Sequence, residues 1–239
     1  MRYGLRAWGS WKVVAMATAV VALVGLAAAP AFAAPAATTW QLSPSSATVT
    51  YGGGVILNGT LKSGQVAVGG KWVEFQQGTT AAGSFQTLLM VTTSDSSYAT
   101  GQYSVPVIPS QTTYYRFSWT GDADFATSNS DVVPVLVKPA LGKPSGPSPV
   151  KKGKKFTVQG SVKPGAPNGP AVKVKSYRKK SNGSWVGYKT YKATVSGTQY
   201  KATFAINDTG TFKFKASTAD SASYAAALSG YSAVITVKK

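Results

Sequence analysis

The sequence predicts an all-β protein made of two tandem antiparallel β-sandwiches. After residue 37, no segment sustains the apolar period of an amphipathic helix. Short runs of β-branched and aromatic residues recur about every ten residues, separated by clusters of Gly, Ser, Asn and Thr. Each half of the chain holds about the number of short strands that one sandwich requires, and each half is long enough to bury a core of its own.

The first 33 residues are expected to be a secretory signal peptide. Three basic residues precede an unbroken apolar run over 13–29. After the run, Ala31-Phe32-Ala33 places small residues where a signal peptidase cleaves. The alternative is a membrane anchor, because about 17 apolar residues reach the short limit for a span. The Ala- and Pro-rich end of the run favours cleavage after Ala33, which gives a secreted mature chain with no transmembrane segment.

Two sandwiches and a linker are expected in the mature chain. The first sandwich covers 38–138, and its expected strands lie at 55–57, 72–75, 85–91, 103–107, 115–119 and 132–137. Residues 139–149 hold four prolines together with Gly and Ser, a composition typical of an extended and fairly stiff linker. The second sandwich covers 150–239, and its expected strands lie at 156–158, 172–175, 185–195, 200–204, 212–216 and 233–237.

The two halves also resemble each other in sequence. The segment 115–117 and the turn at 121–126 correspond to 212–214 and 220–225, at nearly the same spacing. Earlier in each half, Asn58-Gly59-Thr60-Leu61 corresponds to Gln159-Gly160-Ser161-Val162. This similarity indicates a diverged tandem duplication in which the repeated unit is a whole domain.

These repeated residues carry a resemblance to a known family. Over residues 40–239 the sequence resembles the tandem bacterial immunoglobulin-like repeat domains of secreted actinobacterial proteins. The segments that carry the resemblance are Gly59-Thr60-Leu61, 115–117, 121–125, Gly160-Ser161-Val162, 177–180, 183–186, 212–216 and Asp220. The resemblance implies immunoglobulin-like sandwiches that serve as spacers, stalks or ligand-binding modules, and it brings no catalytic residues with it.

Charge divides the chain into two unlike halves. The whole sequence has a formal net charge of +18. Residues 38–138 hold four basic and five acidic side chains, whereas residues 139–239 hold eighteen basic and two acidic ones. The second sandwich therefore carries the positive charge, and the asymmetry indicates a division of labour between the halves.

Strand alternation is expected to gather these basic groups on one surface. Successive side chains of a strand face opposite sides, so the lysines that alternate with Val172, Val174, Phe212 and Phe214 point outward. By their order along the chain, the expected strands at 172–177 and 212–216 correspond to the third and sixth strands of an immunoglobulin sandwich. Those two strands pair side by side in one sheet. The candidate anion-binding residues are Lys173, Lys175, Arg178, Lys179, Lys180, Lys189, Lys192, Lys213 and Lys215.

Anionic cell-envelope polymers or lipid headgroups are the expected partners of these residues. Like charges that face each other across strands are destabilising, and a bound anion would relieve them. The plain alternative is that the lysines only keep the domain soluble. The phosphates of DNA would also fit these lysines, but no residue pattern in the sequence indicates recognition of bases. Trp185, Tyr188 and Tyr191 interleave with the lysines and either stack on sugar rings or fill the core.

No catalytic machinery is expected. The chain has no Cys and no His, which removes thiolate nucleophiles, disulfides, the Ser-His-Asp triad and most transition-metal sites. Glu74 is the only glutamate, so a pair of carboxylates for glycoside hydrolysis has few candidates. Asp122 and Asp124 form either a calcium site or a polar loop, and the loop is favoured.

Two functions follow from these expectations. The first is a non-catalytic secreted or cell-wall-associated protein, without cofactor or metal, that adheres through the basic second sandwich. The second is a structural or accessory module that contacts another protein at the cell surface.

Overall fold

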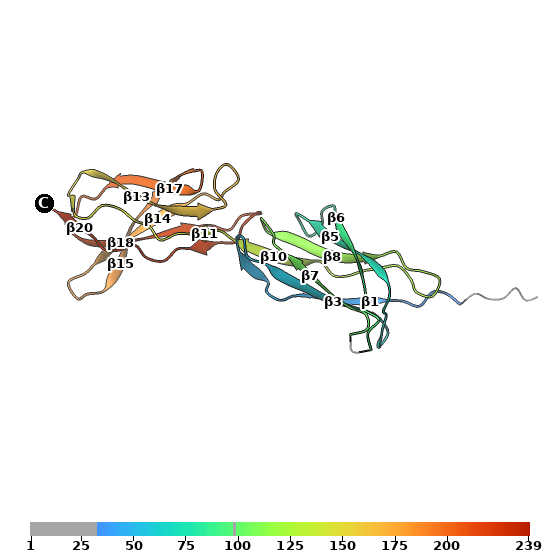
Figure 1. Ribbon diagram of the computed structural model, residues 1–239. Helices are drawn as coiled ribbons and strands as arrows, with labels where there is room; N and C mark the ends of the chain where they lie inside the picture. The colour runs from blue at the N-terminus through green and yellow to red at the C-terminus, as the bar shows by residue number, and fades with distance from the viewer. Residues whose placement is uncertain (1–32, 98) are drawn as a thin grey trace, which may run out of the picture. The chain divides into compact units, whose positions relative to one another are not determined.

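The computed structural model describes residues 33–97 and 99–239, and this part of the chain is all-β (Figure 1). The predicted signal peptide at 1–33 lies outside the described residues apart from Ala33. Four sheets form two β-sandwiches, which confirms the predicted fold class. Over residues 33–97 and 99–239, no helix has the length and apolar character needed to cross a membrane.

The first sandwich packs a four-stranded sheet against a six-stranded sheet. The smaller sheet contains β1 (Thr39–Pro44), β3 (Val55–Ser63), β4 (Val66–Ala67) and β7 (Gln102–Val107). The larger sheet contains β2 (Thr48–Thr50), β5 (Trp72–Gly78), β6 (Gln86–Thr92), β8 (Thr113–Trp119), β9 (Ser128–Asn129) and β10 (Val133–Lys138). The larger sheet has the strand order β2-β10-β8-β5-β6, with β9 paired to β8.

The second sandwich also packs a four-stranded sheet against a six-stranded sheet. Its smaller sheet contains β11 (Ala140–Leu141), β13 (Lys155–Lys163), β16 (Thr194–Ser196) and β17 (Gln199–Ala205). Its larger sheet contains β12 (Val150–Lys151), β14 (Lys173–Lys179), β15 (Trp185–Lys192), β18 (Gly210–Thr218), β19 (Ala227–Leu228) and β20 (Ile235–Lys238). The order β12-β20-β18-β14-β15, with β19 paired to β18, matches the first sandwich strand for strand.

One strand pair in each sandwich is parallel, which the sequence pattern did not predict. Strand β2 runs parallel to β10, and β12 runs parallel to β20, whereas the other pairs are antiparallel. In the first sandwich, β1 pairs with β3 in one sheet and the next strand, β2, pairs with β10 in the other. Apolar alternation reports which side chains face inward, but it carries no information about strand direction.

Residues 139–149 run along the edge of the second sandwich. Ala140 and Leu141 pair with Lys163 and Val162 on β13, and Ser145 forms a bridge with Gln159. The segment is extended, as its proline content predicts, but its backbone is tied to the sheet. The prolines fit because an edge strand needs no backbone N–H on its outer side.

Buried side chains of alternating strand positions form one core in each sandwich. In the first, Phe75 stacks on Tyr115 with 5.3 Å between ring centroids, and Phe117 is fully buried beside both sheets. In the second, Phe212 and Phe214 of β18 are fully buried, and the ring centroids of Phe204 and Phe214 are 5.6 Å apart. Since the chain has no Cys, apolar burial of this kind stabilises the fold without disulfides.

A glycine–tyrosine pair occurs at the same position in both sandwiches. Gly59 lies opposite Tyr103, and Gly160 lies opposite Tyr200. A Cβ atom at either glycine would collide with the ring of its tyrosine, so the ring occupies the space that a side chain would need. The glycine in each of the repeated Gly-Thr-Leu and Gly-Ser-Val segments is therefore needed to make room for the tyrosine ring.

Candidate functional site

Pairing of β14 with β18 brings the predicted lysines together. Lys175 lies directly opposite Lys215, and Tyr177 lies opposite Lys213. At the intervening positions of the two strands, Val174, Ala216 and Phe214 are buried in the core. The lysines at the alternate positions therefore share the outer face of the sheet.

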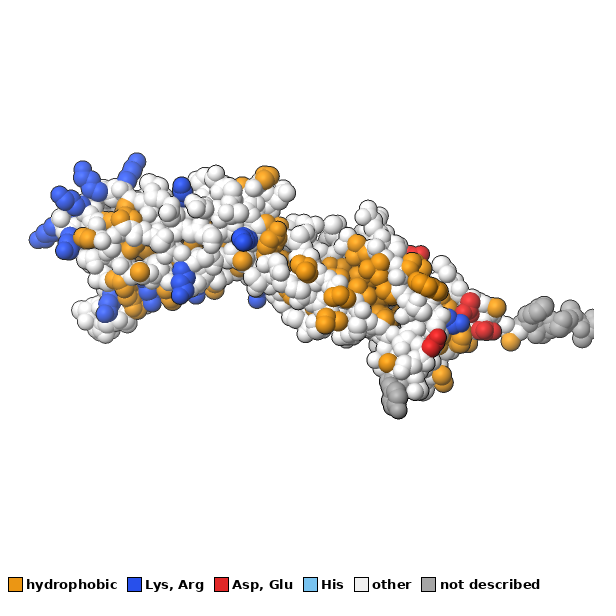
Figure 2. Space-filling view, viewed as in Figure 1, with side chains coloured by type: hydrophobic (Ala, Val, Ile, Leu, Met, Phe, Trp, Pro, Cys, Tyr) orange, Lys and Arg blue, Asp and Glu red, His pale blue; other side chains and the backbone are white. Residues whose placement is uncertain are grey.

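Six lysines belong to this outer face, which we call the basic sheet face. Strand β15 extends it, because Lys192 lies opposite Lys173 and Trp185 lies opposite Lys179. Lys213 and Lys215 are half-buried and the other four are exposed. In Figure 2, most of the visible Lys and Arg side chains lie on the second sandwich and the acidic ones on the first. The basic sheet face comprises Lys173, Lys175, Lys179, Lys192, Lys213 and Lys215.

The lysines of the basic sheet face have no carboxylate beside them. Within the described part of the chain, the ion pairs are Lys71 with Asp122 and Arg178 with Asp208. The other acidic residue of the second sandwich, Asp220, accepts a hydrogen bond from the backbone N–H of Ala226. No ion pair within the described residues therefore balances the charges of this face, and the direct pair of Lys175 and Lys215 costs up to about 1 kcal/mol.

Three aromatic residues lie among these lysines, and we call them the aromatic trio: Tyr177, Trp185 and Tyr231. The ammonium of Lys213 lies 3.7 Å from the ring centroid of Tyr231 and 4.5 Å from that of Trp185. Tyr177 meets Tyr231 edge to face, with 5.3 Å between centroids. Cation–π contacts at exposed sites are worth about 0.5–1 kcal/mol each, so the trio orients Lys213 and offsets part of the repulsion.

Three of the predicted residues lie away from the basic sheet face. Arg178 lies opposite the buried Phe212, and its guanidinium donates a hydrogen bond to the backbone oxygen of Thr209 at 3.0 Å. The ammonium of Lys189 lies 5.4 Å from the ring centroid of Tyr188. Lys180 lies in the turn after β14, where its backbone N–H bonds to Ser184.

A β-bulge in β15 explains how Trp185 and Lys192, which are seven residues apart, share the outer face. The register between β14 and β15 shifts between Lys175 and Tyr177, so Tyr188 and Lys189 together oppose Ser176. The hydroxyl of Ser176 bonds both the N–H and the carbonyl oxygen of Lys189, at 3.1 and 3.0 Å. An extra residue in one strand reverses the alternation beyond it, which single-sequence periodicity does not reveal.

Tyr188 and Tyr191 belong to the interior side of the sheet. Tyr191 stacks on Phe204 with 3.7 Å between centroids, and Tyr188 packs against Phe212. The Tyr188 hydroxyl donates a 2.6 Å hydrogen bond to Asp208. This bond, with burial as a smaller cause, raises the pKa of Tyr188 to about 12. The same bond is the main cause that lowers the pKa of Asp208.

Sequence reasoning missed two members of the aromatic trio and a second group of lysines. Tyr231 lies outside the strands, so no periodicity places it on this face. Tyr177 alternates with Lys175 on β14, and this spacing could have identified it. The second group lies where β12 meets β20, since Lys151 pairs with Lys238, and the run at 151–155 was its signal in the sequence. We call Lys151, Lys154, Lys155 and Lys238 the terminal lysines.

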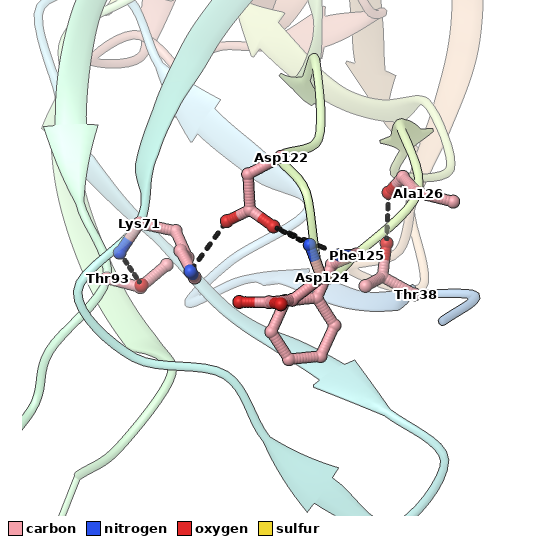
Figure 3. A network of polar contacts seen from close by, with 7 residues as sticks. All are labelled: Thr38, Lys71, Thr93, Asp122, Asp124, Phe125 and Ala126. Carbon is pink, nitrogen blue, oxygen red and sulfur yellow. Dashed lines mark hydrogen bonds and ion pairs between the residues drawn. The ribbon is translucent and has the colours of Figure 1, made fainter. Parts of the chain in front are cut away.

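The acidic loop of the first sandwich is held by its own hydrogen bonds (Figure 3). One carboxylate oxygen of Asp122 accepts hydrogen bonds from the backbone N–H groups of Asp124 and Phe125, at 2.9 and 3.0 Å. The other pairs with the ammonium of Lys71 at 2.6 Å. The bond from Lys71 is the main cause that lowers the pKa of Asp122. The Asp122 carboxylate thus closes the polar loop that the sequence favours.

Glu74 is likewise bound to neighbouring side chains. Its carboxylate accepts hydrogen bonds from Thr87 at 2.6 Å and from Gln76 at 2.7 Å, and these bonds lower its pKa. Over residues 33–97 and 99–239, no group of three or more His, Cys, Asp and Glu side chains is placed to hold a metal ion.

Comparison with known proteins gives a weak structural likeness. No family model matches the chain, and no curated protein matches it. Among solved structures, the chain is similar to the adhesin InvE of Yersinia pseudotuberculosis, with a TM-score of 0.38 and 11% identity. The match covers 84% of this chain and 59% of that chain, so the present chain spans less than two thirds of the adhesin. A likeness at this level carries no argument about function.

Proposed function

We propose that this chain is a non-catalytic secreted or cell-wall-associated protein that adheres to anionic cell-envelope polymers or lipid headgroups through the basic sheet face. The observation that carries the proposal is the direct opposition of Lys175 and Lys215 within a face of six lysines that has no neighbouring carboxylate. A fold tolerates such repulsion more readily when an anion neutralises it.

Charge segregation supports the same proposal. Solubility alone does not require this face, because the first sandwich is nearly neutral over 38–138 and shares the same fold. Each positive charge close to an anionic surface contributes about 1 kcal/mol of attraction, within a Debye length of about 8 Å at physiological salt. Six lysines on one side of one sheet can act on the same surface together.

The experiment uses the mature chain from Ala34. Its binding to purified teichoic acid and to phosphatidylglycerol vesicles is measured at low and at high salt. We expect binding to at least one probe at low salt and its loss at high salt, because the attraction is screened. Absence of binding to both probes at low salt contradicts the proposal.

A second function, contact with another protein, is favoured by the edge strand of the first sandwich. Strand β6 ends its sheet, and Leu88, Leu89 and Met90 are 44%, 41% and 48% exposed. These leucines and Ile108 line a hollow of about 550 Å³ that has no charged residue in its lining. An uncharged apolar edge suits an added strand from a partner protein. Substitution of Leu89 by Lys should abolish such a contact and leave polymer binding unchanged.

A further inference from the structure

We infer that the aromatic trio makes the basic sheet face a binding site for an anionic glycan, a polymer that presents both sugar rings and negative charges. This inference rests on the proposed function and names its class of ligand. Lysines alone recognise negative charge of any kind. Aromatic faces beside them add a preference for ligands that carry a ring or an apolar sugar face next to the charge.

The register of the sheet places the two kinds of side chain in adjoining rows. Lys175 and Lys215 form one row across β14 and β18, and Tyr177 and Lys213 form the next. Rows on one face of a strand are about 7 Å apart. Trp185 lies one strand further, opposite Lys179. A polymer that lies across this face therefore meets both charges and rings.

Local contacts position two of the lysines on this surface. Gly187 lies opposite Tyr177, and a Cβ atom there would approach the side-chain end of Lys175 to 3.0 Å. Glycine at this position therefore leaves room for Lys175 to lie across the strand. Lys213 lies between the rings of Trp185 and Tyr231, which orients its ammonium before a ligand arrives.

A glycan suits these rings better than a membrane does. Tyr177 and Trp185 are half-buried, and Tyr231 is 40% exposed. Tyr177 and Tyr231 also pack against each other, so the rings lie among the lysines rather than standing above them. Residues that anchor a protein to a bilayer bury their apolar parts below the headgroups, whereas sugar stacking needs only an accessible ring face.

The test measures binding of the mature chain from Ala34 to three polymers and to phosphatidylglycerol vesicles. Dextran sulfate presents sugar rings with charge, polyphosphate presents charge without rings, and dextran presents rings without charge. The variant is Trp185→Ala combined with Tyr231→Ala, and the control is Trp72→Ala, which removes a 64% exposed ring from the first sandwich. Circular dichroism verifies that each variant is folded, and Trp185→Phe tests whether any ring suffices.

We expect the double variant to bind dextran sulfate at least tenfold more weakly and polyphosphate less than twofold more weakly. The control should bind both polymers like the wild type, Trp185→Phe should retain most of the affinity, and dextran should bind weakly throughout. Equal losses for dextran sulfate and polyphosphate overturn the inference, and so does unchanged binding of dextran sulfate. A loss confined to phosphatidylglycerol vesicles overturns it in favour of a lipid ligand.

The inference and the proposed function fail in different ways. If the wild type binds both charged polymers and the aromatic variants change nothing, the inference alone is wrong and the proposed function stands. If the wild type binds neither the charged polymers nor phosphatidylglycerol vesicles at low salt, both are wrong.

Discussion

Lys175 and Lys215 lie directly opposite each other on neighbouring antiparallel strands, with their side chains on the outer face of the same sheet. Directly opposed residues have Cβ atoms about 4.5–5.5 Å apart, so the two positive charges repel each other. No carboxylate lies within ion-pair distance of either lysine in the described part of the chain. This pair is the centre of the proposed binding surface.

The repulsion predicts that Lys215→Glu stabilises the protein. The substitution turns a like-charge pair into an opposite-charge pair and should raise the free energy of unfolding by about 1 kcal/mol at low salt. The gain should shrink at high salt because salt screens exposed charges. Urea denaturation of the mature chain measures both effects. Lys201→Glu is the control, since Lys201 is exposed and lies opposite Gln159 and Thr194. An equal gain in the control would show that net charge alone is responsible.

The repeated glycine–tyrosine pair predicts opposite outcomes for two equivalent substitutions. The Tyr200 hydroxyl donates a 2.9 Å hydrogen bond to the carbonyl oxygen of Gly142, so Tyr200→Phe should cost about 1 kcal/mol. The hydroxyl of Tyr103 is buried without a partner among the described residues, so Tyr103→Phe should leave stability unchanged or raise it. Calorimetric unfolding of the mature chain compares the two variants. A larger loss for Tyr103→Phe would contradict this account.

The same packing predicts that neither glycine tolerates a methyl group. Gly59→Ala and Gly160→Ala would place a Cβ atom against the ring of Tyr103 or Tyr200, which must then move out of a filled core. Overpacking of this kind typically costs about 1–3 kcal/mol. The unfolding temperature of each variant measures the loss. Gly54→Ala is the control, because Gly54 is exposed and a Cβ atom there would meet its nearest neighbour, the backbone oxygen of Val107, only at 3.5 Å.

Tyr188 and Asp208 predict a loss of stability at both ends of the pH range. The pKa of Tyr188 is raised to about 12, so its contribution is present below about pH 10 and is lost as pH rises towards 12. The pKa of Asp208 is lowered, so its contribution is present above the ordinary aspartate pKa and is lost as pH falls through the folded-state value. Asp208→Asn should return the Tyr188 pKa towards 10. Titration of labelled tyrosine by NMR measures this change, and Asp220→Asn should leave it unaltered.

The sequence predicted the main features of the second sandwich from strand alternation. Val174 and Phe214 face inward and the lysines beside them face outward, because one side of each strand is buried. The sequence also predicted the pairing of β14 with β18, because their order along the chain corresponds to the third and sixth strands of an immunoglobulin sandwich.

Two features of the site could not be predicted in this way. The bulge at Tyr188 and Lys189 of β15 brings Trp185 onto the same face as Lys192, and a bulge leaves no mark in the periodicity of one strand. Tyr231 reaches the basic sheet face from a segment between β19 and β20, which has no period at all. Arg178 could have been placed inward by counting from Val174, but its position in a basic run suggested an exposed surface.

The most direct test of the central claim is the salt dependence of polyphosphate binding by two variants of equal charge. One replaces Lys173, Lys175, Lys213 and Lys215 by Gln, and the other replaces the four terminal lysines by Gln. Each lysine that releases a counterion from a flexible polyanion contributes about 0.7 to the slope of log affinity against log salt. The account predicts that the first variant loses about 3 units of slope and the second loses less than about 1 unit. Equal losses in the two variants would contradict it, because bulk charge rather than the basic sheet face would then hold the polymer.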